Sequence, residues 1–167
     1  DEQRGAWHAR LEALVVDAIL RADPDEAVLG RASALGWGAR GSIMVVLGNA
    51  HAGPDEADLF EEARHRARSA SLHALCAVQG ARLVLVLGEV TAERAAATAV
   101  AGLFAPGPVV AGPLVADVAH AHASAAGAQA AFRAVPGWPG APRPVLADQL
   151  VVERAAASRA AIGTKSR

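Results

Sequence analysis

The sequence predicts an α+β fold, in which helices cover an antiparallel sheet and further helices flank it at both ends. One observation behind this prediction is an apolar hairpin over residues 72–88, in which two strand-like runs meet at Gln79-Gly80. Gly80 can supply the positive φ that such a tight turn needs. The other is the apolar run from Ile43 to Gly48, because a strand this uniformly apolar is typical of one covered on both faces.

Composition narrows the class of protein further. The chain has 167 residues, 53% of them hydrophobic, which suffices for one core in a single domain with flanking helices. Sixteen basic and seventeen acidic residues argue against a nucleic-acid platform, since phosphate binding needs a net basic face. No stretch reaches the roughly 20 apolar residues of a membrane span, and residues 1–22 have the pattern of an amphipathic helix rather than a signal peptide. We expect a soluble, cytoplasmic protein without a membrane partner.

Residues 1–40 are predicted to form an N-terminal helical flank. Helical spacing from Glu2 to about Arg21 places six apolar residues on one stripe: Trp7, Leu11, Leu14, Val15, Ala18 and Ile19. Asp23-Pro24-Asp25 stops this helix and caps a short second one, which Gly36 ends. The stripe either packs on the sheet or pairs with a second subunit, and the sequence leaves both alternatives open.

Residues 41–148 are predicted to form the central domain. Its first strand runs from Ser42 to Leu47 and is followed by a loop over residues 48–53. Pro54 then opens a helix with acidic residues in its first turn, where the helix dipole favours them. The outer face of this helix has the pattern of a solvated surface with ion pairs such as Glu61 with His65 and Glu62 with Arg66. The alternative is a partner face, on which Arg64, Arg66 and Arg68 meet an acidic patch of another chain.

The elements after the hairpin follow from Pro, Gly and capping signals. Thr91 caps a helix over residues 92–103, and a Pro/Gly break precedes a strand over residues 109–111. Asp117 starts a helix that reaches about Val135. A last short strand ends at Ala147, and Asp148 caps a terminal helix, so residues 149–167 are predicted to be a connector helix and tail.

The order of these elements specifies a topology. Strand, helix, hairpin, helix, strand is the ferredoxin-like plan, a four-stranded antiparallel sheet with helices on one face. Nucleotide cyclases use an elaboration of this plan.

Four short phrases then resemble one family. They are residues 34–37 (ALGW), 78–84 (VQGARLV), 104–113 (FAPGPVVAGP) and 143–148 (RPVLAD). They are similar to actinobacterial PucR/CdaR-type transcription regulators over about residues 11–160. The resemblance implies a central GGDEF-like domain with a fold like that of diguanylate cyclases, followed by a C-terminal helix-turn-helix that binds DNA. Because this chain ends at Arg167, we expect it to be part of such a regulator, with DNA contacted only by a helix-turn-helix outside this sequence.

Cyclase chemistry needs acidic residues that this sequence lacks. Carboxylates must hold Mg²⁺ near the end of the first strand, and a Gly-Gly-acid-acid turn must form the hairpin tip. Here the first strand ends Leu47-Gly48-Asn49 and the tip is Gln79-Gly80-Ala81. We therefore predict that the protein is not an enzyme, has no catalytic, cofactor-binding or metal-binding residues, and uses no cofactor.

Other reactive side chains also favour structural roles. Cys76 is the one cysteine, which excludes an internal disulfide, and its place in a strand predicts a small core residue. His120 and His122 point about 200° apart on a helix, so they cannot chelate one ion together. No serine has the Gly-x-Ser-x-Gly context of a nucleophile.

Two functions fit these observations. The first is a non-catalytic regulatory and dimerisation domain of a PucR/CdaR-like regulator, a homodimer that relays a signal or assembly to a DNA-binding domain. The alternative is a small-molecule sensor, which binds a nucleotide or metabolite effector in a cleft between residues 48–53 and the hairpin tip.

Overall fold

The computed structural model describes residues 2–22, 24–38, 40–53 and 55–165, so the predicted contributions of Asp23 and Pro54 and the end of the tail lie outside the described residues. In chain order the elements are α1 (Glu2–Leu20), α2 (Glu26–Ala34), β1 (Met44–Asn49), α3 (Glu56–Ser69), β2 (His73–Gln79), β3 (Arg82–Gly88), α4 (Glu93–Ala101), β4 (Val109–Ala111), η1 (Val118–His120), α5 (Ala121–Ala134), η2 (Val135–Gly137), β5 (Val145–Leu146) and α6 (Ala147–Lys165), where η1 and η2 are single 3₁₀ turns.

The sheet confirms the predicted fold class and adds a strand to it. Its order is β2-β3-β1-β4-β5. The first four strands pair antiparallel, as the ferredoxin-like plan requires, whereas β5 pairs parallel to β4. The predicted last strand is therefore a fifth, edge strand, because α5 returns the chain to the end of the sheet at which β4 began.

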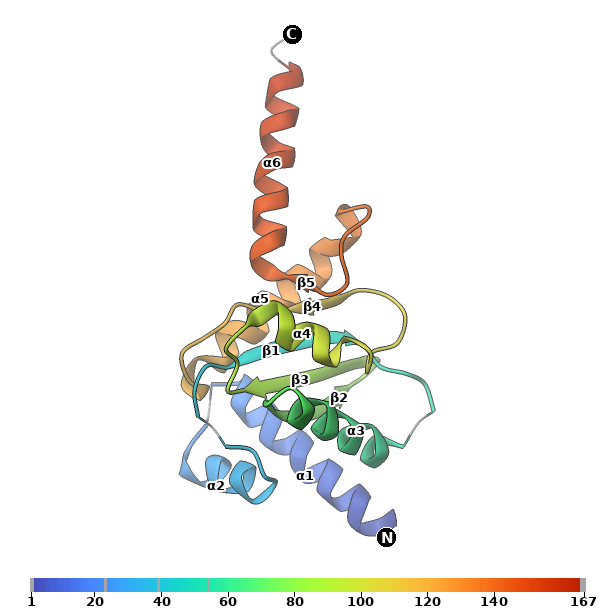
Figure 1. Ribbon diagram of the computed structural model, residues 1–167, viewed down its shortest axis with the longest axis vertical. Coiled ribbons are helices and arrows are strands. Elements are labelled where there is room, and N and C mark those ends of the chain that lie inside the picture. Colours follow the sequence, from blue (N-terminus) through green and yellow to red (C-terminus); the bar gives the residue numbers. More distant parts are fainter. Residues whose placement is uncertain (1, 23, 39, 54, 166–167) are drawn as a thin grey trace.

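Helices cover both faces of the sheet, not one face only (Figure 1). On one face, α3 and α4 contribute Phe60, Ala63 and Val100 to a core with the inner side chains of β1 and β3. On the other face, α1, α2 and α5 contribute Ile19, Ala32 and other small residues to a second core. The uniformly apolar strands are explained by these two layers, since each strand is buried from both sides.

The N-terminal helix packs on the body with a different face from the predicted one. Val15, Ala18 and Ile19 are buried as expected, but Trp7 and Leu14 are 63% and 64% exposed. The reason is that α1 contacts both β2 and α3, which turns Ala9, Glu12 and Val16 inward. Packing on the sheet is therefore the role that the structure shows for this helix.

Several boundaries differ from the predicted ones. The N-cap of α4 is Ala92, which makes no side-chain cap bond, so Thr91 does not cap it. Asp148 lies inside the first turn of α6, which begins directly after β5. Asp117 caps η1 rather than α5 itself. The hairpin is as predicted, and Gly80 has a φ of +64°.

Candidate functional site

The structure brings together the end of β1 and the hairpin tip, where a cyclase would bind its metal ions. Asn49 is paired with Arg82 in the β1–β3 ladder. One residue further on, the N–H of Ala50 donates to the carbonyl of Ala81 at 2.8 Å. The loop after β1 is thus hydrogen-bonded onto the β2–β3 turn, and the two segments that the sequence singled out are neighbours.

The phenyl ring of Phe104 occupies the space beside the last residues of β1. Gly48 lies against Phe104 so closely that a Cβ on Gly48 would overlap the ring. The next residue, Asn49, donates from Nδ2 to the carbonyl of Pro106 at 3.2 Å. Position 48 therefore has no room for a carboxylate side chain, and the side chain at position 49 is bonded to protein.

Arg143, whose role no pattern in the sequence indicates, fixes the segment that covers this end of the sheet. Its guanidinium donates to the carbonyls of Gly107 at 2.9 Å, Ala105 at 3.0 Å and Phe104 at 3.3 Å. A guanidinium has five N–H donors in a fixed plane, so it can bind several carbonyls of one turn. Its place between Pro142 and Pro144 gives no local signal for this role.

The hairpin tip is also bonded to the opposite layer. Gln79 Nε2 donates to Asp17 Oδ1 of α1 at 2.7 Å. Arg82 lies over the ring of Phe132 of α5, 4.4 Å from its centroid. The alternative cleft for a nucleotide or metabolite therefore has its polar groups engaged on both sides, and it stays a prediction that this geometry does not favour.

The main ionisable pair of the chain lies elsewhere, between α1 and α3. Glu12 is fully buried, and both its oxygens accept from Arg64 Nη1, at 2.9 and 3.1 Å. Burial raises the pKa of Glu12 to about 7, against the opposing effects of Arg64 and the backbone N–H of Cys76. Burial alone would lower the pKa of Arg64, but the charge of Glu12 and hydrogen bonds to both carboxylates raise it.

The ion pairs on the outer face of α3 differ in part from the predicted ones. Glu62 pairs with Arg66 at 3.1 Å as predicted, but Glu61 pairs with Arg64 at 3.2 Å instead of with His65. The burial of Glu12 could have been predicted from its helical spacing from Ala9, Val16 and Ile19, which places the four residues on one helix face.

The remaining reactive side chains behave as structural residues. Cys76 is fully buried, and burial raises the pKa of its thiol. His120 Nδ1 lies 2.6 Å from Asp117 Oδ1, and this hydrogen bond lowers the pKa of Asp117. His122 instead contacts the carbonyl of Ala119. Among the side chains that the structure describes, no three His, Cys, Asp or Glu residues gather to hold a metal ion.

Fold and site together define a class: an α+β domain with a five-stranded sheet, in which the end of β1 and the hairpin tip carry Gly48, Asn49 and Gln79-Gly80-Ala81 and no acidic residue. The chain belongs to the GGDEF-like domain family, whose family model matches residues 21–134.

The chain is also similar to curated proteins and to a solved structure. Uncharacterized proteins of Mycobacterium tuberculosis and Mycobacterium bovis are each 38% identical over 162 residues, which is 92% of this chain and 39% of theirs. The chain thus spans about two fifths of the length of these relatives. A crystal structure of a regulator of polyketide synthase expression from Bifidobacterium adolescentis has a similar fold, with a TM-score of 0.65 and 23% identity over 88% of this chain and 62% of that one.

Within the described part of the chain, no helix combines the length and apolar character needed to cross a membrane.

Proposed function

We propose that this chain is a non-catalytic regulatory and dimerisation domain of a PucR/CdaR-like transcription regulator. It would form a homodimer and relay a signal or assembly to a C-terminal DNA-binding domain that is not in this sequence. The GGDEF-like family and the named function of the Bifidobacterium regulator support a regulatory role. The crowded, acid-free end of β1 and the hairpin supports a non-catalytic one.

The proposal rests mainly on the terminal helix α6, which extends away from the body with apolar side chains exposed. In Figure 1, α6 leaves the body beside β5 and extends away from it. Its main contacts with other described elements are with α5 and β5 at its foot, where Leu150 is buried. Beyond the foot, Val151 and Val152 are 67% and 69% exposed.

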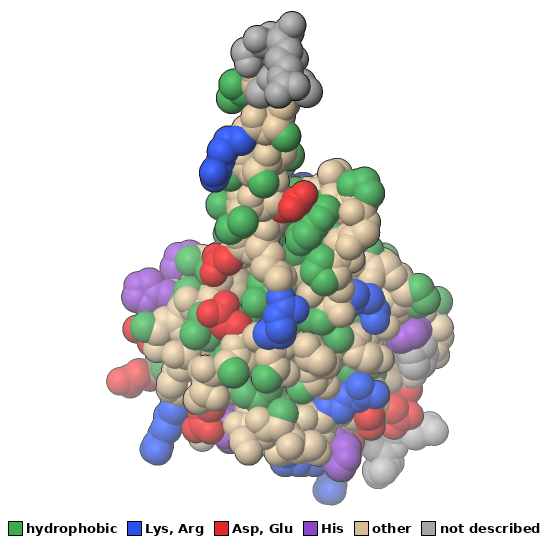
Figure 2. Space-filling view, turned by 45° about the horizontal axis from the view of Figure 1, so that its top comes forward, with side chains coloured by type: hydrophobic (Ala, Val, Ile, Leu, Met, Phe, Trp, Pro, Cys, Tyr) green, Lys and Arg blue, Asp and Glu red, His purple; other side chains and the backbone are tan. Residues whose placement is uncertain are grey.

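The spacing of its side chains gives α6 one face suited to a second copy. Val151, Ala155, Ser158 and Ile162 follow the i, i+4, i+7, i+11 spacing of a single helical stripe. Apolar side chains along the helix are visible in Figure 2. A second α6 packed along this stripe would remove Val151 from water, with Val152 at the edge of the contact, and would join the connectors of two subunits.

Size-exclusion chromatography with light scattering tests the proposal. We expect the chain to be a dimer, and Val151→Glu with Val152→Glu to make it monomeric while its circular dichroism is unchanged. Leu14→Glu is the matched control, since Leu14 is an equally exposed apolar residue on α1. A wild-type chain that stays monomeric at high concentration, or a dimer that Leu14→Glu and not the α6 variant disrupts, would contradict the assignment.

A further inference from the structure

We propose that the end of the sheet opposite the cyclase-like site binds a small amino-carboxylate, a molecule with one ammonium and one carboxylate group such as a free α-amino acid. Two cavities of about 510 and 520 Å³ lie there, and Glu89 lines both of them. Each is within the size range of small-molecule sites. The proposal concerns ligand binding alone and does not depend on dimerisation.

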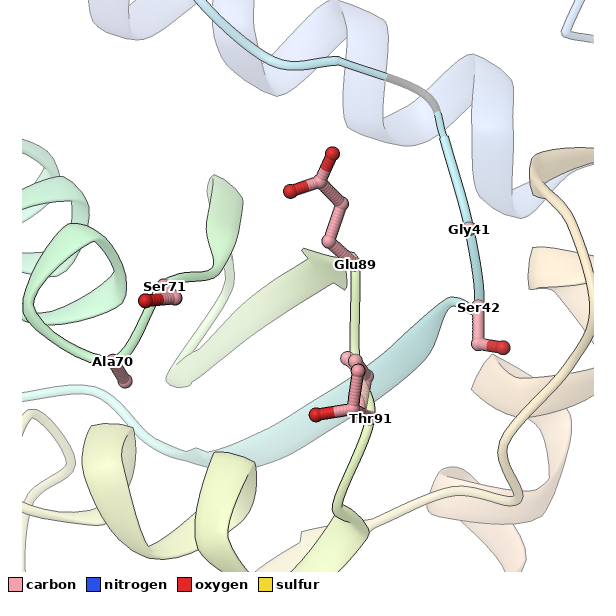
Figure 3. A pocket seen from close by; sticks show the side chains of 7 residues that line it. Gly41, Ser42, Ala70, Ser71, Glu89 and Thr91 are labelled. Atoms are coloured by element: carbon pink, nitrogen blue, oxygen red, sulfur yellow. The ribbon is translucent and has the colours of Figure 1, made fainter.

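The position follows from where the strands begin and end. β3 ends at Gly88, and β2 begins at His73. The segment before β1 runs alongside, because the N–H of Glu89 donates to the carbonyl of Arg40 at 3.3 Å and that of Val90 to Ser42 at 3.0 Å. Figure 3 shows the Glu89 carboxylate extending between the Ala70-Ser71 turn and the Gly41-Ser42 segment.

Two opposite charges, Arg40 and Glu89, line the second cavity without pairing with each other. Arg40 and Glu89 are backbone neighbours and both line it, yet among the described side chains the Arg40 guanidinium has no ion-pair or hydrogen-bond partner. The Glu89 carboxylate lies near His73, with Nε2 at 3.4 Å from Oε2. A ligand with an ammonium group for Glu89 and a carboxylate for Arg40 would neutralise both side chains. A ligand with a single charge would pair with one of them and be repelled by the other.

A buried donor points to the same place. Trp37 lines the second cavity and is 1% exposed, and its indole Nε1 has no hydrogen-bond partner among the described residues. Gly88 lies beside this nitrogen, and a Cβ on Gly88 would be 3.3 Å from it. Buried donors are normally bonded, and a carboxylate held by Arg40 is a suitable acceptor.

Two non-glycine residues with a left-handed backbone line the first cavity. Ser71 and Glu89 have φ values of +60° and +59°, a region that favours glycine, and both line this cavity. Residues in this backbone conformation cluster at binding sites, where the surrounding structure holds the side chain in the position that function requires. The hydroxyls of Ser71 and Thr91 add neutral acceptors beside Glu89 for an ammonium group.

Titrating the ¹⁵N-labelled protein with candidate ligands and recording ¹H–¹⁵N correlation spectra tests the proposal. The indole signal of Trp37 is assigned by its absence from the spectrum of Trp37→Phe. The probes are the proteinogenic L-α-amino acids one at a time, with ethylamine and propionate as single-charge analogues of alanine. We expect at least one amino acid to shift the Trp37 indole and the Glu89 amide saturably, and the analogues to leave both unchanged. No saturable shift with any amino acid, or equal shifts with one analogue, would overturn it.

Variants separate binding from stability. Glu89→Gln and Arg40→Gln are each expected to weaken binding at least tenfold, whereas Glu93→Gln and Arg94→Gln on α4 should leave it unchanged. Glu89→Gly should abolish binding without lowering the melting temperature, since glycine accepts a φ of +59°. Ser71→Gly is the matched control, which relieves the same strain but keeps the charge. Binding retained in Glu89→Gly would contradict the assignment of Glu89.

Discussion

Gly48 shows how one missing side chain determines what the end of β1 can do. The Phe104 ring lies where a Cβ on Gly48 would be. A metal-binding acid at this position would therefore need the ring to move. Asn49 adds to this, because its amide nitrogen is bonded to the Pro106 carbonyl.

Substituting Gly48 tests this packing. Gly48→Ala is expected to lower the free energy of unfolding by about 2 kcal/mol, because one extra methyl group overpacks the contact with Phe104. Gly48→Asp should cost more and should bind no Mg²⁺ detectable by calorimetry. Urea denaturation measures the change in stability.

The control is Gly30→Ala in α2, where an added Cβ meets nothing within 4 Å. Alanine should stabilise that helix by about 0.5 to 1 kcal/mol. Adding Phe104→Ala to Gly48→Ala should cost less than the sum of the single changes. If Gly48→Ala were as stable as the wild type, the ring would not be fixed there.

At the scale of elements, α5 approaches the sheet closely enough to replace a strand hydrogen bond. The N–H of Val45 in β1 donates to the buried Ser124 Oγ of α5 at 2.9 Å, and the carbonyl of Val45 accepts from Gly112 at 2.8 Å. A Cβ on Gly112 would overlap the backbone carbonyl of Ser124. Glycine at 112 and serine at 124 therefore let the helix complete the ladder where β4 ends.

Ser124→Ala is expected to lower the free energy of unfolding by about 2 kcal/mol, because the Val45 N–H would be buried without an acceptor. Chemical denaturation with two-state fitting measures it. Ser69→Ala is the comparison, since that hydroxyl bonds a backbone carbonyl at an exposed position and should matter little. Equal effects of the two substitutions would argue against a special role for Ser124.

How far these elements were predictable depends on which interactions define them. The hairpin and the buried Cys76 followed from local pattern, since alternation and a glycine turn are encoded within a few residues. The face of α1 did not, because Trp7 and Leu14 fit a helical stripe as well as Ala9 and Val16 do, and tertiary packing on β2 and α3 decides between them. Arg143 and Ser124 act on residues 36 to 79 positions away, which no local pattern reveals.

At the scale of the whole molecule, Glu12 couples stability to pH. Its pKa rises from 4.5 to about 7 on folding, so between these values the folded state holds more protons than the unfolded chain. The free energy of unfolding should therefore fall as pH rises from 4.5 to 7, and the contribution of Glu12 is complete below 4.5. The shift corresponds to about 3 kcal/mol.

Glu12→Gln should remove most of this slope, because glutamine has no proton to lose. The measurement is urea denaturation across this pH interval, with wild type and variant compared at each pH. Glu62→Gln is the control, since Glu62 forms an exposed pair with Arg66. A wild-type slope that persists in Glu12→Gln would assign the pH dependence to another group.

Because α6 is long, a small rotation at its foot produces a large displacement at its far end. Nineteen residues at a rise of about 1.5 Å each make an arm of about 28 Å. A tilt of about 10° at Ala147, where the helix begins, would then displace the far end sideways by about 5 Å. In the proposed dimer, a repacking too small to alter the sheet would thus change which residues of the two α6 helices meet.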